Sequence, residues 1–173
     1  MHRNSEGPKV TIGITSYNSE KTIARAIKNA LKQDWRNKEI IIIDDASSDS
    51  SEVKIMNAIK GKDIKLIKNK KNRGASYSRN KIIKNSRGEL ICFMDDDDYS
   101  DSQRVKKQVK QIMESGFPKK KFIACCTGLK KVYKNGHSKI LYPLGTTGRA
   151  PIRNELANFL LFYERKKGVD YGF

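Results

Sequence analysis

The sequence predicts an α/β domain in which a mostly parallel β-sheet is flanked by helices. Short runs of apolar and β-branched residues alternate along the chain with longer segments of helical periodicity. The four isoleucines at residues 40–43 show no polar alternation, which is typical of a strand covered on both faces in a parallel sheet. Three of the expected strands run directly into polar or acidic residues, where open α/β sheets bind their ligands.

The chain length and charge narrow the class of protein. With 173 residues the chain can form one domain with a substantial core, but not two ordinary domains. Its 36 Lys and Arg residues against 19 Asp and Glu give a net charge of +17, which favours acidic partners such as nucleotide phosphates, anionic lipid or nucleic acid. The lysines are scattered among Asn and Ile, a pattern that compositional bias alone would also produce.

The sequence carries no sign of export or membrane insertion. Cys125 and Cys126 are adjacent and Cys92 stands apart, so the cysteines suit neither a disulfide framework nor a zinc site. No apolar run approaches the roughly 20 residues of a membrane span. Residues 1–7 are mostly polar and are expected to be a disordered tail without the apolar region of a signal peptide. We therefore expect a soluble, cytoplasmic protein.

The first half of the chain reads as alternating strands and helices. Strands are expected at residues 10–15 and 40–43, with a helix over 19–33 between them because Ile23, Ile27 and Leu31 recur at helical spacing. A second helix should carry Val53, Met56 and Ile59, and Asp49 with Glu52 resembles a capping box at its start. A third strand is expected at residues 64–67.

The same alternation continues past the middle of the chain. A loop at 72–74 precedes a helix over 76–85, with Ile82 and Ile83 facing inward, and a strand follows at 90–94. One more helix carries apolar residues at helical spacing and ends before Gly116 and Pro118; these residues are Val105, Val109 and Ile112. This order implies parallel strands joined by right-handed crossovers.

The last third of the chain departs from the alternation. Strands over residues 122–133 and 138–142 flank Asn135-Gly136, a dipeptide that favours a hairpin turn of type I′. A glycine-containing stretch at 144–151 should be flexible. Residues 154–164 are expected to form a short helix with Leu156, Phe159, Leu160 and Tyr163 on its apolar side.

Polar groups from three strand ends should meet at one edge of the sheet. They are Thr15 with Tyr17, Asp44 with Asp45, and the run from Asp95 to Asp98. Four successive carboxylates repel one another and need a cation, and Mg²⁺ prefers one or two carboxylates together with substrate phosphates. A tyrosine ring can stack on a base and a carboxylate can accept a hydrogen bond from a base N–H. These groups indicate a nucleotide pocket.

Four ordered motifs carry a resemblance to a known family. Residues 15–18 (TSYN), 43–49 (IDDASSD), 72–80 (Asn-Arg-Gly with Arg79-Asn80) and 94–98 (MDDDD) resemble the successive motifs of the family 2 glycosyltransferases. The resemblance covers residues 8–115 and implies the GT-A (Rossmann-like) fold. It also implies an inverting transfer of a sugar from a nucleoside diphosphate sugar.

The resemblance assigns roles to individual residues. It implies that Thr15, Tyr17 and Asp44 contact the base, usually uracil. It places Arg73 and Arg79 near the phosphates or the sugar.

The acidic run corresponds to the D-x-D motif of the family. The resemblance implies that Asp96 lies near the ribose and the sugar, and that Asp97, together with Asp95, holds Mn²⁺ or Mg²⁺. A cation there would stabilise the charge that develops on the leaving diphosphate.

The chain departs from the family in the region of the general base. In the family this base is an acid well beyond the D-x-D motif, whereas the late acids here, Glu155, Glu164 and Asp170, lie in no such motif. No catalytic base is therefore assigned. We expect a donor-binding part (residues 8–115) and a partial acceptor-side region (116–173) of a longer enzyme. The isolated chain should bind a nucleotide sugar and transfer little.

The expected acceptor is a saccharide or a lipid-linked saccharide, in the synthesis of cell-surface polysaccharide or glycoconjugate. Peripheral contact with the anionic inner face of the membrane is compatible with the basic surface, and no nucleic-acid partner is expected. Two alternatives remain open from the sequence. One is a nucleotidyltransferase acting on a sugar phosphate. The other is a basic module that binds nucleic acid or lipid, with steep salt dependence and indifference to Mn²⁺.

Overall fold

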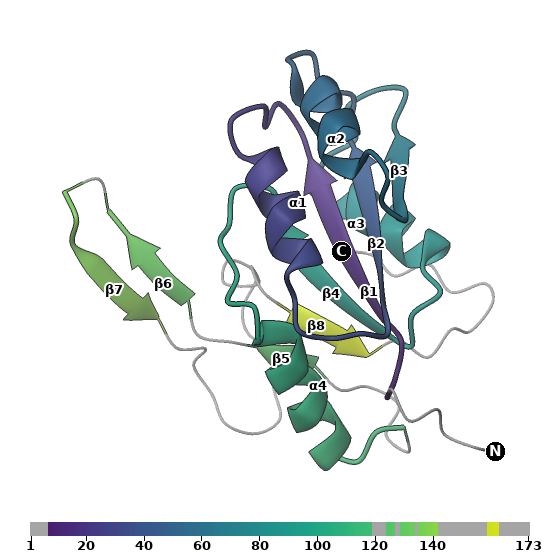
Figure 1. The fold of residues 1–173 in the computed structure, drawn as a ribbon, viewed down its shortest axis with the longest axis vertical. Coiled ribbons are helices and arrows are strands. Elements are labelled where there is room, and N and C mark those ends of the chain that lie inside the picture. The colour runs from purple at the N-terminus through teal and green to yellow at the C-terminus, as the bar shows by residue number, and fades with distance from the viewer. Residues whose placement is uncertain (1–6, 119–123, 127–128, 134, 142–158, 163–173) are drawn as a thin grey trace.

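A six-stranded sheet with the strand order β3-β2-β1-β4-β8-β5 forms the centre of the fold (Figure 1). The structure is a computed structural model and describes residues 7–118, 124–126, 129–133, 135–141 and 159–162. The strands of this sheet are β1 Val10–Ser16, β2 Lys38–Asp44, β3 Ile64–Lys68, β4 Leu90–Asp95, β5 Ala124–Cys126 and β8 Phe159–Phe162. The described helices are α1 Ile23–Leu31, α2 Ser51–Ile59, α3 Ala75–Asn85 and α4 Arg104–Glu114.

The first four strands are parallel, as the alternation of elements predicts. β1 pairs with β2 and β4, and β2 pairs with β3, all in parallel register. Thr15 lies opposite Ile43 on one side and Asp95 on the other, and Ser16 lies opposite Asp44. The polar ends of β1, β2 and β4 therefore lie at one edge of the sheet.

Two hydrophobic cores cover the two faces of this sheet. Ile40 and Ile42 pack into the core that contains residues of α1, α2 and α4, whereas Ile41 and Ile43 pack against α3. Successive side chains of a strand point to opposite faces, so a strand buried on both sides has no polar alternation. The run of isoleucines has this arrangement, and the fold class expected from it is confirmed.

The expected apolar side of α2 is wrong in part. Ile55 is fully buried, whereas Val53 and Met56 are 60% and 53% exposed. α2 packs against α1 through a narrow stripe, so residues next to that stripe stay in solvent. The capping box is not formed either: Asp49 accepts the Ser51 N–H at 2.9 Å, but Glu52 forms an ion pair with Lys68 instead of returning to the cap.

The helix expected over residues 154–164 is wrong where the structure describes this segment. Residues 159–162 form β8, which pairs antiparallel with both β4 and β5. An apolar run as short as Phe-Leu-Leu-Phe fits a helix and a buried strand equally well. The segment forms a strand because it lies between β4 and β5, where its backbone N–H and C=O groups find hydrogen-bond partners on both sides.

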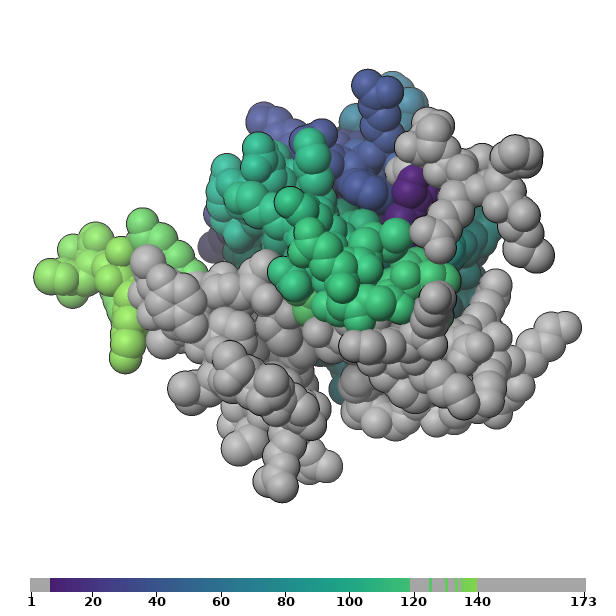
Figure 2. Space-filling view, turned by 90° about the horizontal axis from the view of Figure 1, so that it is seen from below, coloured from purple at the N-terminus to yellow at the C-terminus, as the bar shows by residue number. Residues whose placement is uncertain are grey.

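The expected hairpin is present, but its turn differs. The single strand expected over residues 122–133 is wrong, because β5 belongs to the main sheet, where it pairs with β8, and only β6 belongs to the hairpin. β6 Leu129–Val132 and β7 Ser138–Leu141 pair antiparallel in a separate two-stranded sheet, which projects from the body of the protein (Figures 1 and 2). The Gly136 N–H donates to the Tyr133 carbonyl at 3.0 Å, and Gly136 has a φ of 81°. The Tyr133 N–H donates to the His137 carbonyl, so the loop between the two strands is longer than a two-residue turn. Its glycine adopts the left-handed conformation.

None of the helices in the described ranges is long and apolar enough to cross a membrane. Outside the described residues lie residues 1–6 of the tail expected at 1–7, the stretch expected to be flexible at 144–151 and the late acids Glu155, Glu164 and Asp170.

Candidate active site

A pocket lies at the edge of the sheet where β1, β2 and β4 end and α3 begins. Its volume is about 260 Å³, which suits part of a nucleotide rather than a complete nucleotide sugar. The residues that line it come from four separate segments of the chain: Thr15, Ser16, Tyr17, Asp45, Asn72, Gly74, Ala75, Ser78 and Asp96. The predicted convergence of strand ends is confirmed.

Tyr17 presents its ring at this pocket. Its side chain is 48% exposed, and its backbone N–H donates to the Asp96 carboxylate at 3.3 Å. Thr15 is half-buried between its strand neighbours Ile43 and Asp95. A partly exposed aromatic ring beside a carboxylate offers both a stacking surface and a hydrogen-bond acceptor.

Hydrogen bonds between two loops fix the position of Tyr17. Asn18 follows it in the left-handed conformation, with a φ of 49°. The Asn18 N–H donates to Ser47 Oγ at 3.0 Å, and Asn18 Oδ1 accepts the Ser48 N–H at 2.9 Å. The Ser19 N–H donates to the buried Ser51 Oγ at 2.7 Å. The β1–α1 and β2–α2 loops thus form one wall of the pocket.

Asp45 is a pocket residue that the sequence places at this edge of the sheet, although no role was predicted for it. It is 3% exposed and accepts hydrogen bonds from Asn69 Nδ2 at 2.6 Å, from the Gly74 N–H at 2.7 Å and from the Arg73 N–H at 3.1 Å. These bonds fix the start of α3 against the end of β2. The buried carboxylate therefore sets the shape of the pocket.

Asp44 lies beside the pocket but does not line it. Its side chain is 1% exposed and accepts the Ser47 hydroxyl at 2.5 Å. Asp45, which follows the end of β2, lines the pocket, whereas Asp44, the last residue of β2, does not. The sequence shows that both carboxylates follow one another at the end of this strand, but it does not show which of them lines the pocket. The contact of Asp44 with a base stays a prediction.

Each of the first two acids of the D-x-D run already has a partner. Arg79 Nη2 lies 2.8 Å from Asp95 Oδ1, so the two residues predicted to contact phosphate and metal form an ion pair with each other. Asp96 accepts the Tyr17 N–H. Arg73 stacks over the ring of Tyr77, with its guanidinium carbon 4.2 Å from the ring centre.

The third acid of this run differs from the first two. The side chain of Asp97 is exposed. The main-chain carbonyl of Asp97 accepts a hydrogen bond from Arg25 Nη2 at 2.6 Å, which leaves the carboxylate itself for other partners. Of the three acids of the D-x-D run, Asp97 has the most accessible carboxylate.

The surroundings of Asp96 in the acidic run destabilise the charged form of its carboxyl group. Burial raises the pKa of Asp96, and the neighbouring charges of Asp97 and Asp95 raise it further. Hydrogen bonds from the Ser19 hydroxyl and the Tyr17 N–H oppose this effect without cancelling it. A site that holds several like charges close together favours a bound cation.

Replacing Asp96 by asparagine is expected to stabilise the fold at pH 7 while weakening ligand binding. Asparagine keeps an acceptor for Tyr17 and removes the repulsion, so we expect a gain of about 0.5 kcal/mol in the free energy of unfolding, the scale of a solvent-screened charge interaction. Because the raised pKa penalises the charged form, the gain should disappear below the ordinary pKa of 3.8. Urea unfolding at pH 7 and at low pH measures it, and a loss of stability at pH 7 would contradict it.

The donor groups suit a metal ion shared with a ligand rather than a closed protein site. Within the described ranges, no three His, Cys, Asp or Glu side chains are grouped so that they could hold a metal ion. Mg²⁺ and Mn²⁺ accept one or two carboxylates and complete their coordination with phosphate oxygens and water. The exposed Asp97 carboxylate beside Asp96 fits this requirement. Metal binding by Asp97 and Asp95 stays a prediction.

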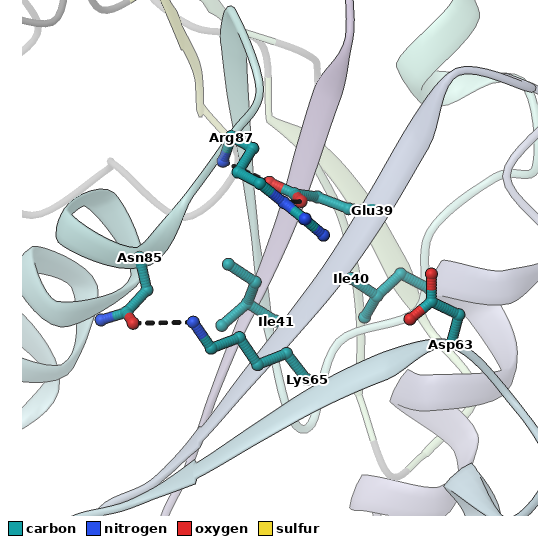
Figure 3. A pocket seen from close by; sticks show the side chains of 7 residues that line it. All are labelled: Glu39, Ile40, Ile41, Asp63, Lys65, Asn85 and Arg87. Atoms are coloured by element: carbon teal, nitrogen blue, oxygen red, sulfur yellow. Dashed lines mark hydrogen bonds and ion pairs between the residues drawn. The ribbon is translucent and has the colours of Figure 1, made fainter.

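A second hollow lies at the opposite end of the sheet, near the amino ends of β2, β3 and β4. Two contacts cross it: Arg87 Nε lies 3.1 Å from Glu39 Oε2, and Lys65 Nζ donates to the neutral Asn85 Oδ1 at 2.8 Å (Figure 3). Parallel α/β sheets bind ligands at the carboxyl ends of their strands. The pocket beside Tyr17 and Asp96 is therefore the candidate active site.

Comparisons with known proteins point to one family. The sequence model described as "Glycosyl transferase family 2" matches residues 11–157. The Escherichia coli protein WfgD, a UDP-Glc:alpha-D-GlcNAc-diphosphoundecaprenol beta-1,3-glucosyltransferase, is 34% identical over 106 residues, which cover 61% of this chain and 42% of WfgD. WfaP from the same species, with the same described activity, is 40% identical over 100 residues, or 58% of this chain and 39% of WfaP. The matched region thus spans about two fifths of these relatives.

Solved structures agree with this assignment. Staphylococcus aureus TarS in complex with UDP has a TM-score of 0.57 and 28% identity, covering 61% of this chain and 32% of TarS. The mannosyltransferase PcManGT from Pyrobaculum calidifontis, solved with GDP-Man and Mn²⁺, has a TM-score of 0.61 at 19% identity over 71% of this chain and 36% of PcManGT, a likeness in fold alone. The fold is of the GT-A type, and the chain belongs to glycosyl transferase family 2.

Proposed function

We propose that this chain is the donor-binding part of a glycosyltransferase that takes its sugar from a nucleoside diphosphate sugar, most simply a UDP-sugar. The observation that carries the proposal is the pocket lined by the exposed Tyr17 and by Asp96, which the exposed Asp97 follows directly in the chain. Support comes from TarS, solved with UDP and with UDP-GlcNAc. The names of WfgD and WfaP support a UDP-sugar donor and a lipid-linked acceptor.

The proposed chemistry divides between recognition of the nucleoside and stabilisation of the leaving group. Thr15, Tyr17 and Asp44 would recognise the base, and Arg73 would approach the phosphates or the sugar. Mn²⁺ or Mg²⁺, held by Asp97 and Asp95, would supply the positive charge that stabilises the leaving diphosphate. In the present structure Arg79 neutralises Asp95, so Arg79 would have to release Asp95 if both carboxylates bind the ion.

The acceptor side of the reaction is proposed from the family alone. Transfer with inversion needs a base that removes the proton of the attacking hydroxyl, and the described residues of the pocket offer no acid beyond Asp45 and Asp96. Both of these carboxylates already accept hydrogen bonds from the backbone. We assign the base to neither. A saccharide or lipid-linked acceptor at the cytoplasmic face of a membrane, in the synthesis of cell-surface polysaccharide, is the proposed context.

Calorimetric titration with a panel of nucleotides tests this proposal. We expect the 173-residue chain to bind UDP, and to bind it more tightly when Mn²⁺ is present, because a metal shared with the diphosphate offsets the repulsion of the acidic run. Tyr17→Ala should weaken UDP binding by about tenfold, in line with the loss of one stacked base. A matched control is Tyr133→Ala, since Tyr133 is similarly exposed but lies on the hairpin.

Two results would contradict the proposed function. Preference for a nucleoside triphosphate with a sugar phosphate would favour a nucleotidyltransferase. Binding that ignores Mn²⁺ but falls steeply with salt, with oligonucleotides as ligands, would favour a basic nucleic-acid module.

A further inference from the structure

The acidic segment that carries the D-x-D run lies against helix α1, far from it in sequence. Hydrogen bonds from Arg25 of α1 and from Gln33, just past the end of α1, join these two parts of the chain. Residues that fix such a segment decide where its carboxylates stand, although they touch no ligand themselves.

At one end of the contact, Arg25 holds the main chain at Asp97. Its Nη2 donates to the Asp97 carbonyl oxygen at 2.6 Å, across 72 positions of sequence. A guanidinium bonded to a carbonyl is a charge-assisted hydrogen bond, which is stronger than a bond between neutral groups. The backbone at Asp97 is thus tied to α1 while its side chain stays exposed.

At the other end, the buried residue Gln33 holds the segment that leads into α4. Its side chain is 2% exposed, donates to the Asp101 carbonyl at 2.9 Å and accepts the Val105 N–H at 3.1 Å. The Asp34 N–H donates to the Ser102 carbonyl at 2.7 Å. With this end fixed, Arg25 is the contact from α1 that orients the acidic residues themselves.

The neighbouring acids are held by other elements. Arg79 of α3 pairs with Asp95, and the β1–α1 loop supplies the Tyr17 N–H to Asp96. Asp97 alone of these three is held through its main chain rather than through its carboxylate. The backbone from which its carboxylate projects is therefore held, and the group that holds it does not neutralise the carboxylate.

We propose that Arg25 is a positioning residue for metal binding: by holding the backbone at Asp97, it keeps the Asp97 carboxylate in the place from which it binds the cation. This inference rests on the proposed function for the metal itself. The anchoring of the acidic segment by Arg25 stands on the hydrogen bond alone.

The direction in which metal binding changes when Arg25 is replaced distinguishes a positioning role from a purely electrostatic role. Arg25 carries a positive charge near four carboxylates, so a purely electrostatic role would oppose a cation, and removal of the charge would strengthen metal binding. A positioning role predicts that removal of Arg25 weakens metal binding, because an acidic segment that is no longer held binds the ion less well. At physiological ionic strength, screening weakens the electrostatic effect of this exposed side chain.

The experiment compares Arg25→Gln and Arg25→Lys with the wild-type chain. In UDP titrations at a series of Mn²⁺ concentrations, we expect Arg25→Gln to raise the half-saturating Mn²⁺ concentration about tenfold, the scale of one charge-assisted hydrogen bond. Arg25→Lys should restore part of the loss, since its ammonium can still donate to the carbonyl. UDP affinity without metal should not change. Lys54→Gln on the exposed side of α2 removes the same charge and should behave as the wild type.

Hydrogen exchange of the metal-free chain provides a second readout that needs no ligand. We expect amides of residues 97–100 to exchange faster in Arg25→Gln than in the wild type or in Lys54→Gln. An unchanged or lower half-saturating Mn²⁺ concentration, or unchanged exchange, would overturn the inference. If the wild-type chain shows no metal-enhanced UDP binding, the proposed function fails, and the exchange result still decides whether Arg25 anchors the segment.

Discussion

Asp97→Asn is expected to abolish the enhancement of UDP binding by Mn²⁺. The amide keeps the size of the side chain but removes the charge that a divalent ion requires from its ligand. Because the Asp97 carboxylate is exposed and Arg25 holds only the main chain, the substitution should leave the fold intact. We expect the affinity at saturating Mn²⁺ to fall on the order of 100-fold, to the value that the wild type shows without metal.

Asp101→Asn is the matched control for this prediction. Asp101 is also exposed, lies four residues further on and caps the following turn by accepting the Gln103 N–H at 2.9 Å, which asparagine can also do. Equal losses in both variants would mean that overall negative charge, rather than a ligand at Asp97, attracts the ion. Metal enhancement that persists in Asp97→Asn would remove Asp97 from the site.

The parallel half of the fold could be predicted because its signals are local and agree with one another. The isoleucines at 40–43 show burial on both faces, and Ile82 and Ile83 fall on the buried side of α3 as expected. Once the strands are parallel, their carboxyl ends must share an edge. This geometric rule brought Thr15, Tyr17 and Asp96 to one pocket without knowledge of any contact.

The errors lie where tertiary contacts decide between local alternatives. Residues 159–162 become a strand because they fill the position between β4 and β5, which no local periodicity reveals. Val53 and Met56 have helical spacing, but the helix that they belong to buries only a narrow stripe around Ile55. Propensity and pattern describe what a segment can form, and its neighbours decide which form it takes.

In the candidate active site, too, local sequence signals could be predicted and tertiary contacts could not. The acids of the D-x-D run are visible in the sequence, whereas the groups that orient them are not. Arg25 and Gln33 look like ordinary polar residues of an amphipathic helix, and their roles depend on a segment about 70 positions away. Asp45 likewise resembles Asp44 until the fold shows that Asp45 lines the pocket and Asp44 does not.

Gly88→Ala is expected to cause the largest loss of stability among the changes considered. Gly88 precedes β4, and its N–H donates to Thr11 Oγ1 of β1 at 3.0 Å. A Cβ at this position would lie 2.5 Å from both the backbone nitrogen and the Oγ1 of Thr11, and 2.8 Å from the Leu90 carbonyl oxygen. Two of these atoms belong to the backbone of paired strands, so they cannot move aside without disturbing the sheet.

Overpacking of a well-packed interior costs typically 1–3 kcal/mol, and we expect about 3 kcal/mol here because backbone atoms are involved. Urea unfolding should show a lower midpoint with an unchanged slope. Asn57→Ala, an exposed change on α2, should stay within about 0.5 kcal/mol of the wild type. Since Gly88 lies at the amino end of the sheet, the folded fraction of the variant should keep its affinity for UDP. A loss below about 1 kcal/mol would mean that the Thr11 strand yields to the added methyl group, in contrast to the rigid sheet edge inferred from the strand pairing.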